Sequence, residues 1–397
     1  MTLLSLARQW ARIPNKSGRV TPVVMGDPKQ SSDGGFERPV RNLGGHVMSL
    51  DSLVSADGVF DPVRVLVDRS SKERFEATYS EAVELASDMI SGIDPWPKDY
   101  RQGFEVALLK ALRFGVVNGA SCVGEALRMA DRESPLPAGM VGPIMDTLEA
   151  SPLARAVLGV EPGSASLRTA GGLSLIMVGS ARIPLPDEGA WEQSSLVQRI
   201  GSWLLKMMVF GSASAVSYRG GGVVILDEAW QFLAGPTGAQ EVQRLMRLAR
   251  SQQVLVVLAS QRVSDFVDAN LVGGISRGLL LPLDRGTGAV DQFGRRDDGQ
   301  AGFALDLFQV ERTDERLRRM SGARTVEGSD LPNWDSMRSL RDPQSGEVVR
   351  GTVGLYSDLS GRVVPAEIVI PPAFLAEIST NISDVRARGG AVSMRGA

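Results

Sequence analysis

Two adjacent acids, Asp227 and Glu228, follow a short apolar run, Val223 to Leu226, within the stretch RGGGVVILDEAWQF. An apolar run of this length, between glycines and a polar turn, predicts a buried strand of a parallel sheet. The two carboxylates then stand at the carboxyl end of the strand, which is where open α/β sheets bind their ligands. Such a pair suits Mg²⁺ coordination by Asp227, usually through water, and activation of an attacking water by Glu228. The alternative is that the acids only favour the N-terminus of the helix that follows them.

A second apolar run, within QVLVVLASQ (253–261), predicts the neighbouring strand, and it ends in the polar residue Gln261. A helix predicted over 239–251 connects the two strands. A strand with two acids, a helix, and a strand with a polar end form the order expected of RecA-like ATPases. Because phosphoryl transfer depends mostly on positioned charges and dipoles, a polar residue such as Gln261 senses the γ-phosphate in this chemistry. We therefore favour a nucleotide-hydrolysing site over simple helix capping.

The phosphate-binding half of such a site is not found in these 397 residues. It requires the pattern G-x-x-x-x-G-K-[ST], in which backbone amides cradle the phosphates and the lysine neutralises them. None of the six lysines in the sequence follows a glycine. We therefore expect weak ATP binding at best from this chain, despite its acidic pair.

The composition excludes several other classes of protein. The formal net charge of −3 argues against a uniformly basic nucleic-acid binder, so any DNA contact must be local. The single cysteine, Cys122, cannot form an intramolecular disulfide, and with the single histidine, His46, it cannot form a metal cluster. No apolar run reaches about 20 residues, the length that spans a bilayer. These features fit a reducing, cytoplasmic setting.

The order of segments predicts an α/β protein with a helical insertion. Strands are expected around VVMGDPK, HVMSL and LSLIMVGS, the first ending at Gly26 and Asp27, and a hairpin is expected around the turn SDLSG. The helical patterns between the second and third of these strands show no strand signal. We divide the chain into a first part of the core (1–74), an all-helical insertion (75–165), the rest of the core with the acidic and sensor strands (166–380), and a flexible tail (381–397).

Several motifs stand in a specific order along the chain: MTLLSLARQW, VVMGDPK, LGGHVMSL and FDP, then the helical segment, then DEAW and a strand ending in glutamine. This order resembles the C-terminal ATPase domain of the TraC-like conjugative-transfer and type IV secretion ATPases, within the HerA/FtsK superfamily. The resemblance runs from Met1 to about Thr380, where PPAFLAEIST is similar to the family's closing segment. It implies a RecA-like P-loop NTPase sheet flanked by helices, with an all-helical insertion.

The resemblance also implies cofactors, partners and further site residues. The cofactors would be ATP and Mg²⁺, the assembly a homo-hexamer, and the partners the channel proteins of a secretion or conjugation apparatus, with DNA as a cargo. The protein would be cytoplasmic or peripheral at the cytoplasmic face of the membrane. Arg247 or Arg250 would reach a neighbouring subunit's γ-phosphate as an arginine finger, although a solvated helix face explains them equally well. Asp27 and Lys29 would contact nucleotide or a partner subunit, unless they and Pro28 simply turn the chain.

In this family the phosphate loop leads straight into the helix that MTLLSLARQW resembles, so the loop is expected immediately before Met1. The expected function is an ATP-dependent motor subunit of conjugative DNA transfer or type IV secretion, truncated at its N-terminus so that ATP binding and hydrolysis are impaired. The alternatives are a non-catalytic partner in a motor ring and a degenerate remnant. The arginines between Arg285 and Arg324 either line a DNA path or form a solvated surface.

Overall fold

The computed structural model divides the chain into two compact units. The sheet unit spans Leu6–Ala259, and the hairpin unit spans Ser260–Glu377 together with the first residues of the chain. Each unit has its own hydrophobic core. The structure describes residues 2–30, 36–93, 95–163, 172–179, 184, 193–233, 242–243, 245–246, 249, 253–275, 277–284, 286–290, 292, 294, 296–342, 344–345, 347–358, 360–371 and 374.

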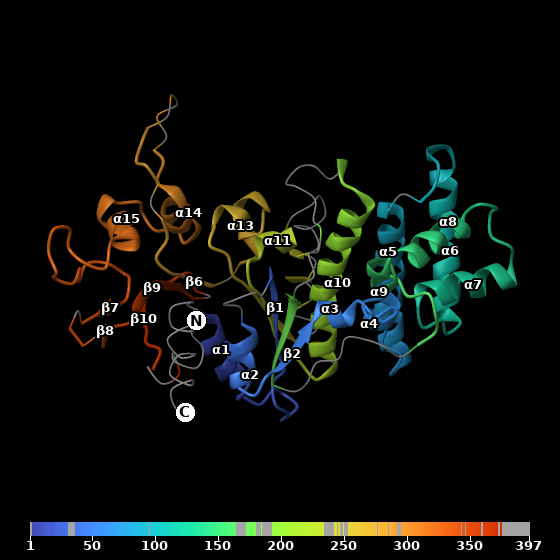
Figure 1. Ribbon diagram of the computed structural model, residues 1–397, viewed down its shortest axis with the longest axis horizontal. Helices are drawn as coiled ribbons and strands as arrows, with labels where there is room; N and C mark the ends of the chain where they lie inside the picture. Colours follow the sequence, from blue (N-terminus) through green and yellow to red (C-terminus); the bar gives the residue numbers. More distant parts are fainter. Residues whose placement is uncertain are drawn as a thin grey trace, which may run out of the picture. The chain divides into compact units, whose positions relative to one another are not determined.

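Among the described residues, the sheet unit is built on parallel strands in the order β2-β3-β1-β4-β5. β1 and β2 of this sheet are labelled in Figure 1. The strands are β1 (Val23–Gln30), β2 (His46–Ser49), β3 (Leu173–Gly179), β4 (Gly222–Leu226) and β5 (Val254–Leu258). β1 lies in the middle, with Val23 opposite Leu173 of β3 on one side and opposite Val223 of β4 on the other. The predicted α/β fold, a parallel sheet flanked by helices, is confirmed.

β1 continues further than the sequence predicted. The expected strand ended at Gly26 and Asp27, but β1 runs past Pro28 to Gln30. Its pairing with β3 shifts register between Asp27 and Gln30. Proline has no N–H to donate to the ladder, so the strand passes Pro28 as an irregularity instead of ending there.

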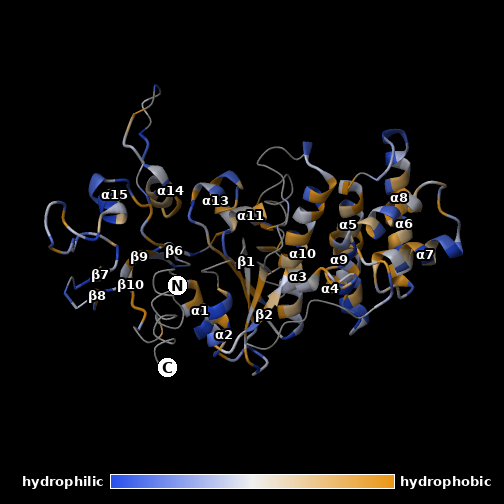
Figure 2. Cartoon of the chain, in the orientation of Figure 1, coloured by the Kyte–Doolittle hydropathy of each residue, from blue (hydrophilic) through white to orange (hydrophobic). Residues whose placement is uncertain are grey.

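The long helix α10 (Leu196–Tyr218) packs against β1, β4 and β5. It begins with a capping box, in which the Ser195 hydroxyl accepts the Gln198 N–H and the Gln198 side chain accepts the Ser195 N–H. By length and composition α10 could cross a membrane, although the apolar runs of the sequence predicted no such segment. However, 89% of its most apolar window is buried inside the protein, as in the core helix of a water-soluble domain. Figure 2 shows many apolar residues along α10 and the neighbouring strands.

Shorter helices accompany the strands. They are α1 (Thr2–Trp10), α2 (Glu37–Asn42), α3 (Leu50–Leu53), α4 (Pro62–Leu66) and α11 (Trp230–Leu233). α1 buries Leu4 and Ala7, which lie three residues apart on one helix face. The opening stretch therefore forms the amphipathic helix that its spacing predicts.

A block of helices stands between β2 and β3, and in the part of this range that the structure describes there is no strand. It comprises α5 (Lys72–Ile93), η1 (Lys98–Tyr100), α6 (Arg101–Val117), α7 (Val123–Glu133), α8 (Val141–Ala150) and α9 (Pro152–Val157). α6 and α7 approach closely at Gly115, where an added Cβ would lie 2.3 Å from the Ala126 Cα. The block shares one hydrophobic core with the sheet, so the two form a single unit.

A buried carboxylate ties the loops of this block together. Asp61 accepts N–H groups from Val63 (2.9 Å), Val123 (3.0 Å) and Gly159 (2.7 Å). The Arg64 guanidinium donates to three backbone carbonyls in the same loops. These contacts join the starts of α4 and α7 to the chain after α9.

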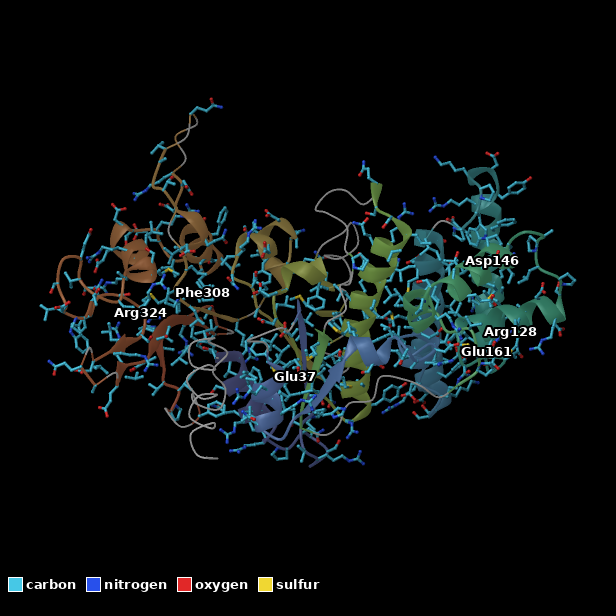
Figure 3. All side chains as sticks on the ribbon, in the orientation of Figure 1. Glu37, Arg128, Asp146, Glu161, Phe308 and Arg324 are labelled. Carbon is cyan, nitrogen blue, oxygen red and sulfur yellow. The ribbon has the colours of Figure 1, made fainter. Side chains whose placement is uncertain are left out.

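The hairpin unit contains an antiparallel sheet of strand order β10-β9-β6 and a separate pair, β7 with β8. Its elements are α13 (Ser264–Asp268), η3 (Val272–Gly274), β6 (Gly278–Leu280), α14 (Gly299–Leu307), α15 (Asp314–Ser321), β7 (Leu340–Arg341), β8 (Val348–Arg350), β9 (Thr352–Ser357) and β10 (Val363–Ile368). Leu305 and Phe308 belong to its core. Phe308 is labelled in Figure 3. β9 and β10 form the hairpin predicted around SDLSG, with Ser357 opposite Val363.

Candidate active site

The carboxyl ends of β1 and β4 lie side by side and carry acids. Gly26 pairs with Leu226 in the parallel register, and the Asp227 N–H donates to the Gly26 carbonyl at 3.0 Å. Asp27 and Asp227 therefore leave neighbouring strands at the same edge of the sheet. Asp27 is only 3% exposed, and Asp227 is half-buried. The structure brings these two predicted residues together, as the parallel arrangement requires.

Glu228 is held in an unusual backbone conformation directly after the strand. Its φ of +49° lies in the left-handed region, which costs a non-glycine residue about 1 kcal/mol or more. Hydrogen bonds on both sides fix the turn, because the Ala229 N–H donates to the Ala259 carbonyl at 2.8 Å and the Ala259 N–H to the Leu226 carbonyl at 2.9 Å. Glu228 is 6% exposed. The end of β5 thus takes part in positioning this carboxylate.

Gly26 lets the surrounding elements pack close beneath the acids. A Cβ at this position would lie 3.2 Å from the Met208 Cε of α10, 3.4 Å from Leu226 Cδ2 and 3.6 Å from the Phe232 Cζ of α11. The first of these distances is tighter than ordinary van der Waals contact. To admit a Cβ here, the end of the flexible Met208 side chain would have to give way by a few tenths of an ångström, so the glycine before Asp27 permits this close packing.

The acids fit Mg²⁺ only together with a ligand that brings further oxygens. Within the described part of the chain, no group of three or more His, Cys, Asp and Glu side chains could hold a metal ion. Protein sites for Mg²⁺ commonly use one or two carboxylates, several waters and substrate phosphates. The half-buried Asp227 at the sheet edge matches that limited protein contribution.

The other predicted site residues lie elsewhere or outside the described residues. Gln261 stands three residues beyond β5, is exposed, and belongs to the start of the hairpin unit. Lys29 lies within β1, but its side chain is outside the described residues. Arg247 and Arg250 also lie outside them. The geometry of the site therefore rests on Asp27, Asp227 and Glu228.

β5 differs from the buried strand that its sequence predicted. Among the described residues it pairs only with β4. Leu255 is 43% exposed and the residues from Val256 to Leu258 are half-buried, although every residue of the strand is apolar. Edge strands usually carry charges or proline that discourage further pairing. This strand carries neither, so its free side is suited to another strand.

The arginines considered for a DNA path are mostly paired with acids. Ion pairs join such arginines to carboxylates of the hairpin unit, and they involve Arg296, Arg312, Arg316, Arg318 and Arg319. The shortest guanidinium contact of Arg296, 2.7 Å, is to Asp314. Arg324 is exposed on the same unit (Figure 3). This pattern favours the solvated surface over a continuous basic path.

Asp27, Asp227 and Glu228, at the carboxyl ends of β1 and β4, are called the acidic edge below. The fold and the acidic edge agree with the chain's similarity to known proteins. Residues 19–374 match the family described as AAA-like domain, and the chain belongs to that family. The fold is similar to the structure of VirB4 of Thermoanaerobacter pseudethanolicus, with a TM-score of 0.52, 12% sequence identity, and coverage of 89% of this chain and 83% of that one. No curated protein matches the sequence. The family match confirms the predicted resemblance to ATPases at the level of the AAA-like domain family, and the structural similarity confirms the fold.

Proposed function

We propose that this chain carries the ATPase domain of a motor subunit in a conjugative DNA-transfer or type IV secretion apparatus. The acidic edge carries the proposal, because Asp227 and the buried Glu228 end β4 beside Asp27 of β1. Strained residues such as Glu228 cluster at functional sites, where the surrounding structure holds them in place. Membership of the AAA-like domain family supports the same function.

The residues of the edge receive distinct roles. Asp227 holds Mg²⁺ through water, Glu228 orients and polarises the attacking water, and Gln261 senses the γ-phosphate. ATP with its Mg²⁺ supplies the phosphoryl group and the remaining metal ligands. Contacts to nucleotide or to a neighbouring subunit are assigned to the remaining predicted residues, Asp27, Lys29, Arg247 and Arg250.

We further propose that the missing phosphate loop belongs to a strand that pairs with the free side of β5. The 397 residues contain no G-x-x-x-x-G-K-[ST] pattern. The exposed Leu255 and the unpaired side of β5 among the described residues support a place for such a strand. A loop at the carboxyl end of that strand would lie at the same edge as the acids, since parallel strands end together.

The remaining assignments concern organisation and assembly. The core is proposed to comprise residues 1–74 and 166–380, with an all-helical insertion at 75–165 and a tail at 381–397. The assembly is proposed to be a homo-hexamer that works with channel proteins and has DNA as a cargo. Its place is proposed to be the cytoplasm or the cytoplasmic face of the membrane.

Isothermal titration with Mg-ATP tests the site in two proteins, the 397-residue chain and the chain lengthened to include a phosphate-loop strand. The first should show no micromolar binding, and the second should bind and hydrolyse ATP. In the lengthened protein, Glu228→Gln should lower turnover by about 100-fold or more while leaving ATP binding intact, because only the activation of water is lost. Glu161→Gln, a change of an exposed acid after α9, is the matched control.

Unchanged turnover of the Glu228→Gln protein would remove Glu228 from its role. Micromolar ATP binding by the 397-residue chain would contradict the proposed place of the phosphate loop. If neither protein hydrolyses ATP but the 397-residue chain binds a complete homologous ATPase, the non-catalytic ring partner is favoured. The absence of the phosphate-loop lysine pattern from the 397 residues also supports that function. Failure to bind either nucleotide or a homologue is the result expected of a remnant.

A further inference from the structure

Exposed cations gather at the amino ends of β1 and β4, on two loops that lie against each other. Arg12, Lys16 and Arg19 belong to the loop between α1 and β1, and Arg219 belongs to the loop between α10 and β4. All four side chains are exposed, and neither loop contains an acidic residue. The ion pairs among the described residues involve none of these four cations. This end of the sheet therefore carries positive charge that no neighbouring carboxylate neutralises.

Hydrogen bonds fix the backbone of the first loop and join it to the second. The Asn15 side chain accepts the N–H groups of Ser17 (3.0 Å) and Arg19 (3.1 Å), and its amide donates to the Arg219 carbonyl (2.9 Å). Gly220 lies so close to Ser17 that an added Cβ would be 2.5 Å from the Ser17 Oγ. Because one asparagine side chain bonds to the backbone of both loops, their cations belong to one surface.

Exposed aliphatic side chains lie among these cations. Ile13 and Val20 are 55% and 58% exposed. They stand at the two ends of the first loop, which an isolated β-bridge between Pro14 and Val20 brings together. Beside them lies a cavity of about 290 Å³, which Trp10, Ile13 and Lys16 help to line. The surface thus combines positive charge, aliphatic groups and a half-buried indole.

We propose that this surface binds an anionic lipid membrane. The basic loop surface, as it is called below, consists of Arg12, Ile13, Lys16, Arg19, Val20 and Arg219. Anionic headgroups attract clustered lysines and arginines, and aliphatic side chains beside them gain free energy by entering the boundary between headgroups and acyl chains. An indole such as that of Trp10 suits the level of the headgroups.

The membrane contact and the acidic edge lie at opposite ends of the same strands. The basic loop surface precedes β1 and β4, whereas Asp27, Asp227 and Glu228 lie at their carboxyl ends. A membrane at the amino ends therefore leaves the acidic edge open to nucleotide. The contact gives a surface to the membrane location proposed above, and it does not depend on ATP hydrolysis.

A membrane suits this surface better than a nucleic acid does. The phosphates of both attract cations, so charge alone does not separate them. Proteins that bind single strands stack bases on aromatic rings, whereas Ile13 and Val20 are aliphatic and gain most by leaving water. The exposed ring of Tyr218 stands beside Arg219, however, so binding of an oligonucleotide is measured as the competing outcome.

Vesicle flotation tests the contact in the 397-residue chain. The chain should float with vesicles of three parts phosphatidylcholine to one part phosphatidylserine, and it should not float with phosphatidylcholine alone. Arg12→Glu with Lys16→Glu should lower the affinity by at least about twentyfold, since each basic residue near an anionic surface contributes a factor of about five. Lys98→Glu with Arg324→Glu makes the same charge changes at exposed positions outside the surface, and it should bind as the unchanged protein does.

A second variant tests the aliphatic part of the surface without changing its charge. Val20→Ser should weaken vesicle binding about fivefold, because a side chain that leaves water on binding has been removed. Val290→Ser is the matched control, since Val290 is a 64% exposed valine of the hairpin unit. Its vesicle binding should equal that of the unchanged protein.

Three results would overturn the proposal: equal binding to both kinds of vesicle, binding to neither, and variants that bind like their controls. A single-stranded oligonucleotide labelled for fluorescence anisotropy is the probe for nucleic acid. If the chain binds this oligonucleotide but no vesicle, and Arg12→Glu with Lys16→Glu abolishes the binding, the surface belongs to nucleic acid. ATP hydrolysis by the lengthened protein is measured without vesicles, so the motor proposal stands or fails separately.

Discussion

At the scale of single residues, Asp61 couples the protonation of a carboxyl group to folding. Burial raises the pKa of Asp61 to about 6, against the opposing effect of its three backbone N–H donors. The group's usual pKa is 3.8, so between these two values the folded protein binds the proton more tightly than the unfolded chain does. The resulting contribution to stability is fully present below about pH 4 and is lost as the pH rises through about 6.

Asp61→Asn should remove this dependence, because an amide does not titrate in this range. The unfolding free energy of the unchanged protein should fall relative to that of the variant by about 2 kcal/mol between pH 4 and pH 7. Urea titrations across this range measure the difference. Asp146→Asn, in which an exposed acid of α8 is changed, controls for the loss of a charge (Figure 3). If the unfolding free energies of the Asp61→Asn and unchanged proteins change with pH in the same way, the coupling is contradicted.

The chemistry of the acidic pair could be predicted from sequence, but its conformation could not. Two acids after an apolar run indicate a strand end whatever the rest of the fold. The left-handed φ of Glu228 depends on hydrogen bonds between Ala229, Ala259 and Leu226, which bring together residues thirty or more positions apart. The roles of Gln261, Arg247 and Arg250 remain predictions.

At the scale of elements, amide exchange can test whether one side of β5 is unpaired, as it is among the described residues. The Ala259 N–H donates to Leu226 of β4, and alternation along a strand directs the N–H groups of Leu255 and Val257 the same way. Those of Val256 and Leu258 then point to the unpaired side. In the 397-residue chain, the Val256 and Leu258 amides should exchange at least about tenfold faster than the Leu255 and Val257 amides.

Residue-resolved amide exchange by NMR measures these rates in both forms of the protein. A phosphate-loop strand added to the chain should slow Val256 and Leu258 and leave Leu255 and Val257 unchanged. Equal protection of all four amides in the 397-residue chain would mean that another part of the chain already covers the strand.

Periodicity predicted the elements that depend on local pattern, and missed those that depend on neighbours. The strands β1, β3 and β4 and the β9–β10 hairpin lie where alternation, apolar runs and turn residues indicated. β1 extends past Pro28 because pairing with β3 resumes at Gln30. The exposure of β5 could not be predicted, since a strand's sequence does not state how many partners the strand has.

At the scale of the whole molecule, the described residues form a hydrophobic core in each unit, and these two cores do not share residues. One core joins the sheet to the helical block, with Leu112 among its fully buried residues. The other lies between the helices and strands of the hairpin unit and includes Leu305. The sequence showed no linker at Ala259 and Ser260, because β5 leads directly into the second unit. The division follows from which side chains pack together, and local patterns do not contain that information.

Separate cores predict separate losses of stability. Leu305→Ala removes a side chain that is fully buried in the hairpin unit, and it should lower the stability of that unit by about 2–5 kcal/mol. Exchange of the β4 amides in the sheet unit should stay unchanged, because no residue of that core is altered. Leu112→Ala is the reciprocal variant, and it should increase exchange in β4 while sparing β9. If either change increases exchange equally in β4 and β9, the two units unfold as one, and the division of the chain into two separately stabilised parts is wrong.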